Sequence, residues 1–256
     1  MQNDLDLALE CAHHAAAIVL AGFDTPTETI FKSEVDPVTE FDRAAETSIR
    51  TLLAKERPED SILGEEEGGG RWDAGRVWIV DPLDGTVNFV HRIPQVAVSV
   101  ALWEDGRPLV GVVHDAIRGE VFAAAAGAGA TLDGRPIAVS DVADTGRALV
   151  ATGFPYDRRD KATELVEVVA RVLTEVQDIR RIGSAALDLC WVAAGRFDAY
   201  WEYGLKPWDT AAGHLIVEEA GGNISDLSGA VYNPDAVAIL ASNGLIHDRL
   251  RTVIQQ

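Results

Sequence analysis

Two carboxylates stand three residues apart, at Asp81 and Asp84, in the segment 81–86 of sequence DPLDGT. The segment follows the apolar run 77–80, which predicts a buried strand. Because proline fixes φ and favours an extended conformation in the residue before it, we expect Asp81 to end this strand with its side chain directed away from the sheet. Hard divalent cations prefer carboxylate oxygen, and magnesium is usually shared between a few carboxylates and a substrate phosphate. The spacing therefore predicts metal-assisted phosphoryl chemistry.

The residues after Asp84 predict the anion-binding side of the same site. A helix that begins near Gly85 would direct its first amide groups and the hydroxyl of Thr86 at a phosphate, because a helix N-terminus has unpaired N–H donors and a positive dipole end. Asp-Pro and Asp-Gly are also ordinary turn dipeptides, and that interpretation stays open for either one alone. A phosphatase of the haloacid dehalogenase type would need a nucleophilic aspartate at position 82. Since Pro82 cannot attack phosphorus, the sequence favours a metal-bound water over a covalent aspartyl phosphate.

Two further segments supply carboxylates. Glu65 begins a cluster of glutamates that follows the short apolar run 61–64, and Asp209 opens an apolar-periodic stretch that ends at the glycines 221–222. The first segment would place carboxylates just past a strand end, and the second would place Asp209 in the first turn of a helix. The alternatives are a solvated acidic turn for Glu65 and, for Asp209, an N-terminal charge favoured by the helix dipole.

Taken together and in this order, the three segments resemble the inositol monophosphatase family of magnesium-dependent, lithium-sensitive phosphatases. The likeness is carried by GEE at 64–66, WIVDPLDGTVNF at 78–89, and WDTAAG at 208–213, which continues to EAGG at 219–222. It extends to 111–113, 127–130 and 183–186, and so covers nearly the whole chain.

The resemblance implies a site for two to three Mg²⁺ ions. Glu65, Asp81 and the backbone carbonyl of Leu83 would hold the first ion, and Asp81, Asp84 and Asp209 would hold the second, so that Asp81 bridges them. A third, weaker ion would share Glu65. The first ion would lower the pKa of a bound water, which makes Glu65 part of the catalytic set.

The resemblance also gives Thr86 and Asp42 a catalytic role. The hydroxyl of Thr86, paired with Asp42, would position the water for in-line attack on phosphorus. The segment 39–42, TEFD, is equally a capping box at the start of the second helix. The residues alone favour the cap, and only the resemblance makes Asp42 a partner of Thr86.

The implied substrate-binding residues are Gly85, Thr86, Gly183, Ser184, Ala185, Glu202 and Asp209. A Gly-Ser pair that opens a helix offers amide and hydroxyl donors to phosphate or sugar oxygen, although a plain helix cap is the alternative for Ser184. Glu202 corresponds to the glutamate that accepts hydrogen bonds from the ring hydroxyls of inositol in this family.

The composition limits the partners. The 256 residues include 41 acidic and 22 basic ones, which gives a formal charge of −19, and they contain no run of Lys or Arg. Direct binding to nucleic acid or to an anionic membrane is therefore not expected, whereas bound magnesium would invert the local charge at a phosphate site. Cys11 and Cys190 provide neither a disulfide framework nor a zinc spacing, and we expect both to be buried and reduced. The acidic N-terminus and the lack of an apolar run of membrane-spanning length predict a cytoplasmic protein.

Periodicity predicts interleaved helices and strands. Helical spacing of apolar residues is found in 5–19, 45–53 and 165–176; strands are expected at 96–103, 109–114, 121–125 and 137–139, in an antiparallel meander, and at 198–202 and 237–241. This pattern indicates an α+β or mixed α/β fold, which the resemblance sharpens to the layered αβαβα sandwich of the sugar phosphatases. We expect 1–256 to be a single domain, with a subdivision near 140–150 into an N-terminal metal-binding half and a C-terminal half.

The resulting hypothesis is a magnesium-dependent phosphomonoesterase that hydrolyses inositol 1-phosphate, a small phosphorylated polyol, and forms a homodimer. The alternative is a histidinol-phosphate phosphatase or another sugar or nucleotide phosphatase of the same superfamily, and Glu202 favours inositol over histidinol phosphate. A hypothesis of another class is a binding protein in a transcription complex, a role that some bacterial relatives have.

Overall fold

The computed structural model of the protein describes residues 2–25, 29–33 and 36–256. The helices are α1 (Gln2–Phe23), α2 (Glu40–Glu56), α3 (Thr86–Val90), α4 (Ala162–Leu173), α5 (Ala185–Ala193), α6 (Pro207–Glu219) and α7 (His247–Gln255), with a 3₁₀ turn at Thr145–Arg147. The strands are β1 (Thr29–Ser33), β2 (Asp36–Thr39), β3 (Ser61–Gly64), β4 (Gly68–Gly69), β5 (Arg76–Asp84), β6 (Ala97–Glu104), β7 (Arg107–Asp115), β8 (Val121–Ala125), β9 (Ala130–Leu132), β10 (Arg135–Pro136), β11 (Leu149–Thr152), β12 (Asp178–Arg180), β13 (Ala199–Tyr203), β14 (Asn223–Ser225) and β15 (Ala238–Ser242). The helices and strands are interleaved along the chain, as predicted.

The first sheet has the order β10-β9-β8-β7-β6-β5-β3-β4. Strands β5 to β10 pair antiparallel in succession, which confirms the predicted meander, and β3 pairs parallel with β5. The prediction of a strand at 137–139 is wrong, because β10 pairs with β9 at this edge of the sheet instead. The amide of Ile137 still donates to Ala130, but that of Val139 donates to Ala220 at the end of α6, so the chain leaves the sheet there.

The second sheet has the order β12-β11-β13-β15-β14. Strand β11 pairs parallel with β12 and with β13, while β15 pairs antiparallel with β13 and β14. The strands predicted at 198–202 and 237–241 are β13 and β15, each shifted by one residue. All strands up to β10 belong to the first sheet or to the β1–β2 hairpin, and all strands from β11 onward belong to the second.

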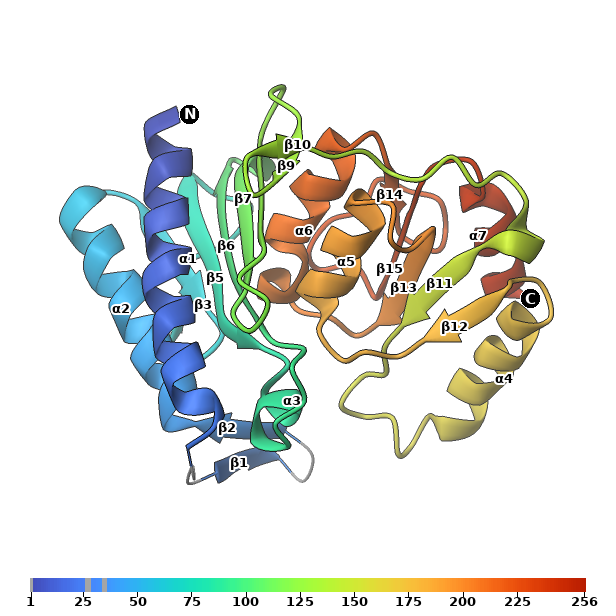
Figure 1. The fold of residues 1–256 in the computed structure, drawn as a ribbon, viewed down its shortest axis with the longest axis horizontal. Coiled ribbons are helices and arrows are strands. Elements are labelled where there is room, and N and C mark those ends of the chain that lie inside the picture. The colour runs from blue at the N-terminus through green and yellow to red at the C-terminus, as the bar shows by residue number, and fades with distance from the viewer. Residues whose placement is uncertain (1, 26–28, 34–35) are drawn as a thin grey trace.

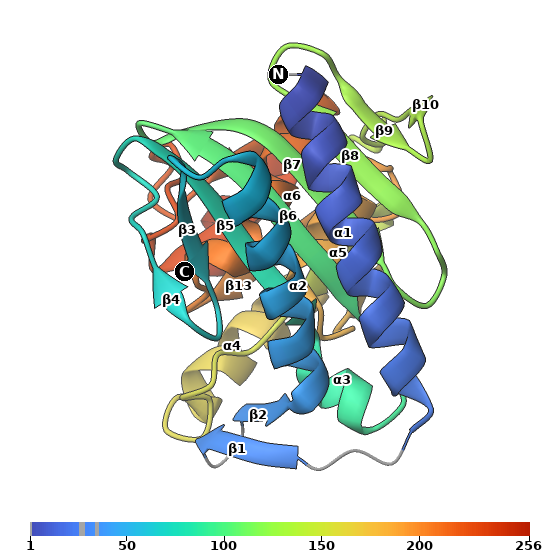
Figure 2. The same ribbon diagram turned by 90° about the vertical axis from the view of Figure 1, so that its left-hand side faces the viewer.

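Five layers result. Helices α1 and α2 cover the outer face of the first sheet, α5 and α6 lie between the two sheets, and α4 and α7 cover the outer face of the second (Figure 1). Figure 2 shows α1 and α2 lying across the first sheet from its outer side. Three apolar clusters fill the spaces: one under α1 and α2, one between the sheets around α5 and α6, and one under α4 and α7. The expected αβαβα sandwich is confirmed.

Two glycines allow helix α6 to lie unusually close to its neighbours. A Cβ atom on Gly111 of β7 would lie 2.6 Å from the backbone oxygen of Ala212, and one on Gly213 would lie 2.6 Å from Leu189 on α5. Any larger residue would push the helix away from the sheet or from α5. The two glycines therefore set how closely α6, which carries Asp209, packs against β7 and α5.

Helix α1 corrects one expectation. The part Asn3–Phe23 is long and apolar enough to cross a membrane by length and composition, with 44% of its most apolar window buried. The prediction that no apolar run approaches that length is therefore wrong for this helix. In the fold its apolar face packs on the first sheet, with Leu7, Ala15 and Val19 in the core. Cys11 on this helix and Cys190 on α5 are buried and free, as expected.

Candidate active site

Asp81 and Asp84 lie at the end of β5, but not as predicted. The strand runs on to Asp84, so the expectation that Asp81 ends it is wrong. The pairing of β5 with β6 is irregular between Asp81 and Asp84, and Pro82 falls in this interval, where its missing N–H breaks no regular ladder. The amide of Leu83 donates to Oδ1 of Asp81 at 3.0 Å, which turns that buried carboxylate back onto its own strand.

Helix α3 begins directly after this strand, as predicted. Gly85 precedes it with φ of 92°, a left-handed conformation that glycine adopts without strain. A side chain there would also lie 2.8 Å from the backbone oxygen of Gln95. Asn88, which the sequence did not single out, donates to the carbonyls of Gln95 and Ile182 at 2.9 Å each. It ties the α3 turn to the segment that carries Gly183.

Asp42 caps α2 and also contacts Thr86. Its Oδ2 accepts hydrogen bonds from the backbone and the hydroxyl of Thr39, which makes it the third helical residue of a capping box on α2. Its Oδ1 accepts a hydrogen bond of 3.1 Å from the hydroxyl of Thr86, which also lies 3.1 Å from the carbonyl of Leu83. The cap thus fixes the carboxylate that holds Thr86.

Asp84 and Ser184 are one hundred residues apart in the sequence and form a hydrogen bond. The Ser184 hydroxyl donates to Asp84 Oδ2 at 2.5 Å, and the backbone amide of Ala186 donates to the same oxygen at 2.8 Å. Ser184 is also the N-cap of α5 and accepts from the amide of Leu187. The N-terminus of α5 is therefore directed at Asp84, and Gly183 before it has φ of 87°.

Asp209 lies in the first turn of α6, as predicted, and accepts a hydrogen bond of 2.7 Å from the backbone amide of Lys206. Burial raises its pKa well above the ordinary range despite this hydrogen bond, and Asp84, Glu65 and Glu202 raise it further.

Glu65 is positioned by two residues that the sequence reading missed. Glu46 on α2 is fully buried, and its carboxylate accepts from the amides of Glu66 and Glu67 at 2.8 and 3.1 Å and from Arg50 at 2.7 Å. This carboxylate holds the turn that carries Glu65. The signal was present: Glu46 lies in the apolar stripe of α2, with Arg50 one helical turn later.

A cavity of about 320 Å³ opens over these residues. Of the predicted site residues, it is lined by Asp84, Gly85, Thr86, Gly183, Ser184, Ala185, Glu202 and Asp209. Asp42, Asp81 and Leu83 lie behind this wall, and Glu65 lines a separate hollow beside α2. The cavity wall also includes Arg158, Arg181 and Lys206.

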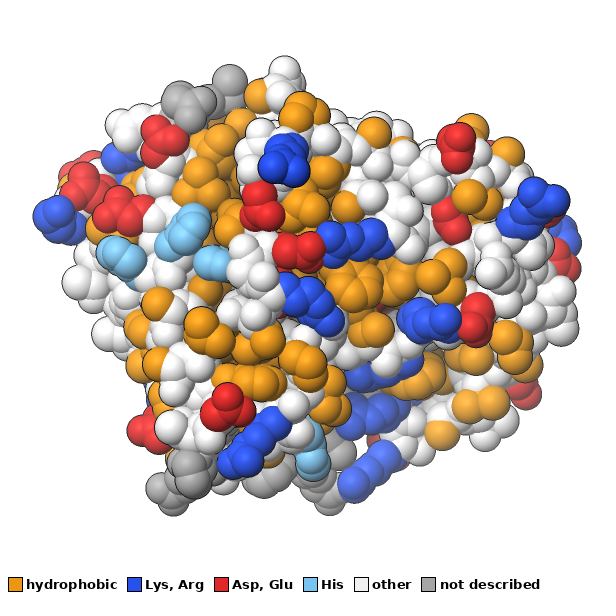
Figure 3. Space-filling model, viewed as in Figure 1, with side chains coloured by type: hydrophobic (Ala, Val, Ile, Leu, Met, Phe, Trp, Pro, Cys, Tyr) orange, Lys and Arg blue, Asp and Glu red, His pale blue; other side chains and the backbone are white. Residues whose placement is uncertain are grey.

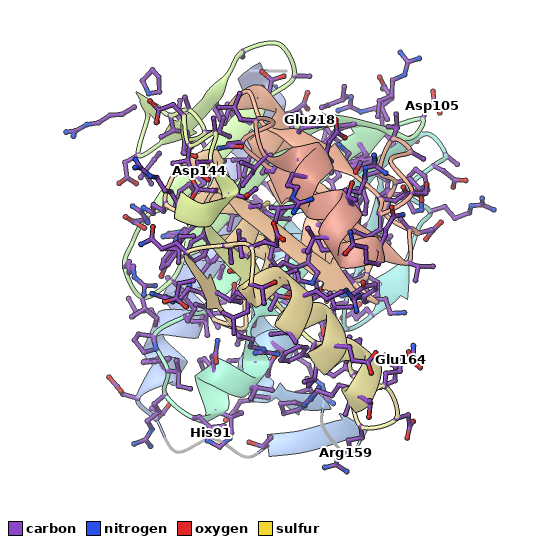
Figure 4. All side chains as sticks on the ribbon, turned by 90° about the vertical axis from the view of Figure 1, so that its right-hand side faces the viewer. His91, Asp105, Asp144, Arg159, Glu164 and Glu218 are labelled. Atoms are coloured by element: carbon purple, nitrogen blue, oxygen red, sulfur yellow. The ribbon has the colours of Figure 1, made fainter. Side chains whose placement is uncertain are left out.

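Basic side chains also gather on the surface of the molecule. Along the middle of the face in Figure 3, several basic side chains form a band between the two halves of the molecule. His91 follows α3 and lies at the lower end of the molecule, where Arg159 is also found (Figure 4). It is not among the residues that line the cavity. A larger cavity of about 770 Å³ adjoins the first and shares Tyr156, Tyr203 and Lys206 with it.

The carboxylates at the cavity repel one another. Burial raises the pKa of Asp81 well above its usual range, and Glu65, Asp84 and Asp209 raise it further; the Asp81 and Glu65 side chains also share a hydrogen bond. Burial raises the pKa of Asp84 to about 6 against the lowering effect of Ser184 and Ala186. Four hard oxygen donors whose charges disfavour each other are the donor set that a divalent cation would neutralise. Across the described ranges, no group of three or more acidic, histidine or cysteine side chains is placed to hold a metal ion as it stands.

Glu202 also lines the cavity. Its Oε2 accepts a hydrogen bond of 2.5 Å from the hydroxyl of Tyr200, which points to the same face of β13. Burial raises the pKa of Glu202 to about 7, while Tyr200 and Arg181 lower it. Tyr200 and Arg181 were not singled out from the sequence, although the spacing of Tyr200 and Glu202 at i and i+2 on a strand was a usable signal.

The whole chain is similar in sequence to known proteins. The model of the inositol monophosphatase family matches residues 1–256. A protein of Escherichia coli (strain K12) named Nus factor SuhB is 43% identical over 232 residues, which cover 90% of this chain and 87% of that protein. An inositol-1-monophosphatase of Synechocystis is 41% identical over 252 residues, 98% of this chain and 88% of that protein.

A solved structure leads to the same assignment. The inositol monophosphatase from Anabaena superposes with a TM-score of 0.91 at 40% identity, covering 100% of this chain and 96% of its own. With the carboxylate cluster, the helix N-termini and the layered fold in place, the chain belongs to the inositol monophosphatase family, a family of phosphatases.

Proposed function

We propose that this protein is a magnesium-dependent phosphomonoesterase that hydrolyses inositol 1-phosphate. The observation that carries the proposal is the convergence of Asp81, Asp84, Asp209 and Glu65, two of which line a cavity together with the N-terminal turns of α3 and α5. Carboxylates suit a hard cation, and amide and hydroxyl donors suit a phosphate.

The four carboxylates would hold two to three Mg²⁺ ions, with the Leu83 carbonyl as an additional donor. When bound, these ions would supply positive charge that attracts the phosphate, activates water and stabilises the leaving oxygen. The chain itself would keep the ligands in place: Ser184 and Ala186 orient Asp84, the Lys206 amide orients Asp209, and Glu46 holds the turn of Glu65.

Thr86 and Asp42 would handle the proton of the attacking water. The Thr86 hydroxyl donates to Asp42 Oδ1, so its lone pairs are directed toward the cavity and can accept a hydrogen bond from water. As the water is consumed, its proton can move to Thr86 Oγ1 while the Thr86 proton moves to Asp42. Burial raises the pKa of Asp42, which favours this transfer, although hydrogen bonds from Thr39 and Thr86 oppose the shift.

Glu202 supports a polyol as the alcohol part of the substrate. A buried carboxylate at the cavity wall is a strong acceptor for ring hydroxyls, and Gly183, Ser184 and Ala185 line the same cavity. Histidinol phosphate and other sugar or nucleotide monoesters are the competing substrates, since they would use the same carboxylates and phosphate donors.

A phosphate-release panel with purified protein tests the proposal. We expect Mg²⁺-dependent release from inositol 1-phosphate with a higher kcat/KM than from histidinol phosphate, fructose 1,6-bisphosphate, a nucleoside 3′-phosphate or an aryl phosphate. Lithium is expected to inhibit release from every substrate. If the protein prefers histidinol phosphate, that compound replaces inositol 1-phosphate as the proposed substrate. If none of these esters shows Mg²⁺-dependent phosphate release, the phosphatase proposal is wrong.

A second candidate function is a role in a transcription complex. It is supported by the 43% identity to a protein named Nus factor SuhB, over 90% of this chain. Binding of the purified protein to a reconstituted transcription elongation complex, measured by gel shift, would test it. The Asp84→Asn protein is expected to bind as well as wild type, because this role would not use the cavity. No binding by a folded, active protein would remove this second function.

By the same family resemblance we also propose that the protein is a homodimer and acts in the cytoplasm. Analytical ultracentrifugation is expected to give twice the mass of one chain, and a monomer at micromolar concentration would remove the dimer.

A further inference from the structure

Glu202 is a buried residue of the cavity wall. Only 9% of the residue is exposed, and its side chain faces strand β11, which pairs parallel with β13. The register aligns Thr152 with Trp201, so the next residue, Gly153, comes beside Glu202. Neighbours on paired strands direct their side chains to the same face of the sheet. Gly153 and Glu202 therefore compete for the same space.

Because Gly153 has no side chain, the Glu202 carboxyl group can occupy that space. A Cβ atom at position 153 would lie 1.8 Å from Oε2, 2.1 Å from Cδ and 2.3 Å from Oε1 of the carboxylate. Its φ is outside the left-handed region, so the backbone itself does not require glycine. What requires glycine here is the volume of the Glu202 carboxyl group.

Tyr200 and the neighbouring charges fix where the carboxylate points. The Tyr200 hydroxyl, fully buried, donates to Oε2. Asp188 on α5 is also buried, and its Oδ1 has no hydrogen-bond partner among the described side chains and backbone. Burial raises the pKa of Asp188 well above its usual range, and Glu202 raises it further, so the two acids repel each other when both are ionised. A carboxylate under such repulsion keeps its orientation only if a donor and a fitted space hold it.

We propose that Gly153 and Tyr200 are positioning residues for Glu202, and that they make this site selective for phosphates of cyclic polyols. Gly153 provides the space for the carboxylate, and Tyr200 donates to Oε2, so that the other oxygen stays available to ring hydroxyls. The inference rests on the proposed polyol substrate. Neither residue touches the carboxylates proposed to hold metal, so neither should affect the reaction at phosphorus.

The test compares kcat/KM for inositol 1-phosphate and for p-nitrophenyl phosphate, which lacks a polyol ring. Gly153→Ala is expected to lower kcat/KM for inositol 1-phosphate by about tenfold to a hundredfold, and Tyr200→Phe by about tenfold, mainly through KM, because each disturbs one charge-assisted hydrogen bond. Hydrolysis of p-nitrophenyl phosphate should stay at the wild-type level. Gly146→Ala is the matched control: this glycine also has an ordinary φ, does not line the cavity, and has only the Asp144 side chain nearby.

The double variants show whether the two residues act through Glu202. In a Glu202→Ala protein, adding Gly153→Ala or Tyr200→Phe should cause no further loss, since the carboxylate that they position is gone. Thermal melts establish that each variant is folded. If Gly153→Ala does not fold, Tyr200→Phe adds no atoms and carries the test alone.

Three results would overturn the inference. One is an equal loss on both substrates in a folded variant, and another is a loss that persists on the Glu202→Ala background. Both would appear only in the variants. The third is a wild type that does not prefer inositol 1-phosphate over p-nitrophenyl phosphate; this result appears without any mutation and removes the proposed polyol substrate together with the inference.

Discussion

Asp84 combines two opposed properties at the scale of a single residue. It accepts hydrogen bonds from Ser184 and Ala186, yet burial raises its pKa to about 6. Burial therefore destabilises the charged form of Asp84 in the folded protein, and a bound cation would offset this destabilisation. The same residue can thus be expendable for folding and indispensable for turnover.

Asp84→Asn is expected to abolish phosphate release and to leave the fold intact. The amide oxygen can still accept from Ser184 and Ala186, while the charge proposed to bind Mg²⁺ is lost. A rise in pKa from 3.8 to about 6 corresponds to about 3 kcal/mol of destabilisation of the charged form, so the metal-free variant should melt above wild type near neutral pH. Phosphate release and thermal melts measure both effects, with Asp248→Asn on the exposed face of α7 as control. Near-normal activity of a folded Asp84→Asn protein would contradict the metal assignment.

Glu202→Gln tests the residue that is proposed to bind the alcohol part of the substrate. The neutral amide is a weaker acceptor for ring hydroxyls, so kcat/KM for inositol 1-phosphate should fall by about tenfold to a hundredfold, while kcat/KM for an aryl phosphate should change little. Lithium inhibition should be retained, because the metal carboxylates are untouched. Equal losses on both substrates would show that Glu202 supports the whole site and does not select the alcohol.

At the scale of elements, the site depends on how helices and strands begin and end. The N-termini of α3, α5 and α6 all meet the end of β5, and each delivers one polar residue: Thr86, Ser184 and Asp209. The turn after β3 is different, because no helix begins there. Its position depends on Glu46 and Arg50 from α2.

Glu46→Gln is therefore expected to loosen the turn that carries Glu65. Glutamine can keep one of the acceptors but loses the charge that pairs with Arg50, which should lower the free energy of unfolding by about 2 kcal/mol. The Mg²⁺ concentration for half-maximal activity should rise. Urea unfolding and a magnesium titration measure the two effects, and Glu56→Gln, exposed on the same helix, is the control. Unchanged magnesium dependence in a destabilised protein would mean that Glu65 does not ligate an ion.

At the scale of the whole molecule, acidic groups are buried in excess of basic ones. Burial raises the pKa of Asp42, Asp81, Asp84, Glu202 and Asp209. A carboxyl group with a raised pKa binds its proton more tightly in the folded state than in the unfolded one. Over the interval between its usual pKa and the raised one, the free energy of unfolding falls as pH rises.

The metal-free protein is accordingly expected to lose stability as pH rises from about 4, through the pKa of about 6 for Asp84 and about 7 for Glu202. Magnesium should reverse this loss, since an ion that binds only the folded state stabilises it by mass action. Melting temperatures across this pH range, with EDTA and with millimolar Mg²⁺, measure the effect. The Asp84→Asn protein should show a shallower decline. A melting temperature that rises with pH in EDTA would contradict the repulsion among the carboxylates.

Local signals in the sequence determined much of the fold and of the site. The capping box at 39–42, the glycine before α3, the Gly-Ser that opens α5 and the meander with its turn dipeptides could all be read in advance, because each depends on a few adjacent residues. The predictions that one strand ends at Asp81 and that another covers 137–139 were wrong. In both places the backbone found its hydrogen-bond partners in distant segments, at the irregular β5–β6 pairing and at Ala220.

The tertiary structure alone decided what surrounds each acidic side chain. Sequence spacing could name Asp84 and Glu202 as candidates, but three contacts join residues that lie 100, 20 and 49 positions apart. These are the hydrogen bond of Asp84 with Ser184, that of buried Glu46 with the amide of Glu66, and the fit of the Glu202 carboxylate over Gly153. Burial and the proximity of like charges set the pKa of a carboxylate, and both depend on how the two sheets and their helices pack. The sequence thus determined which residues could do the chemistry, and the packing of the layers decided which of them share one cavity.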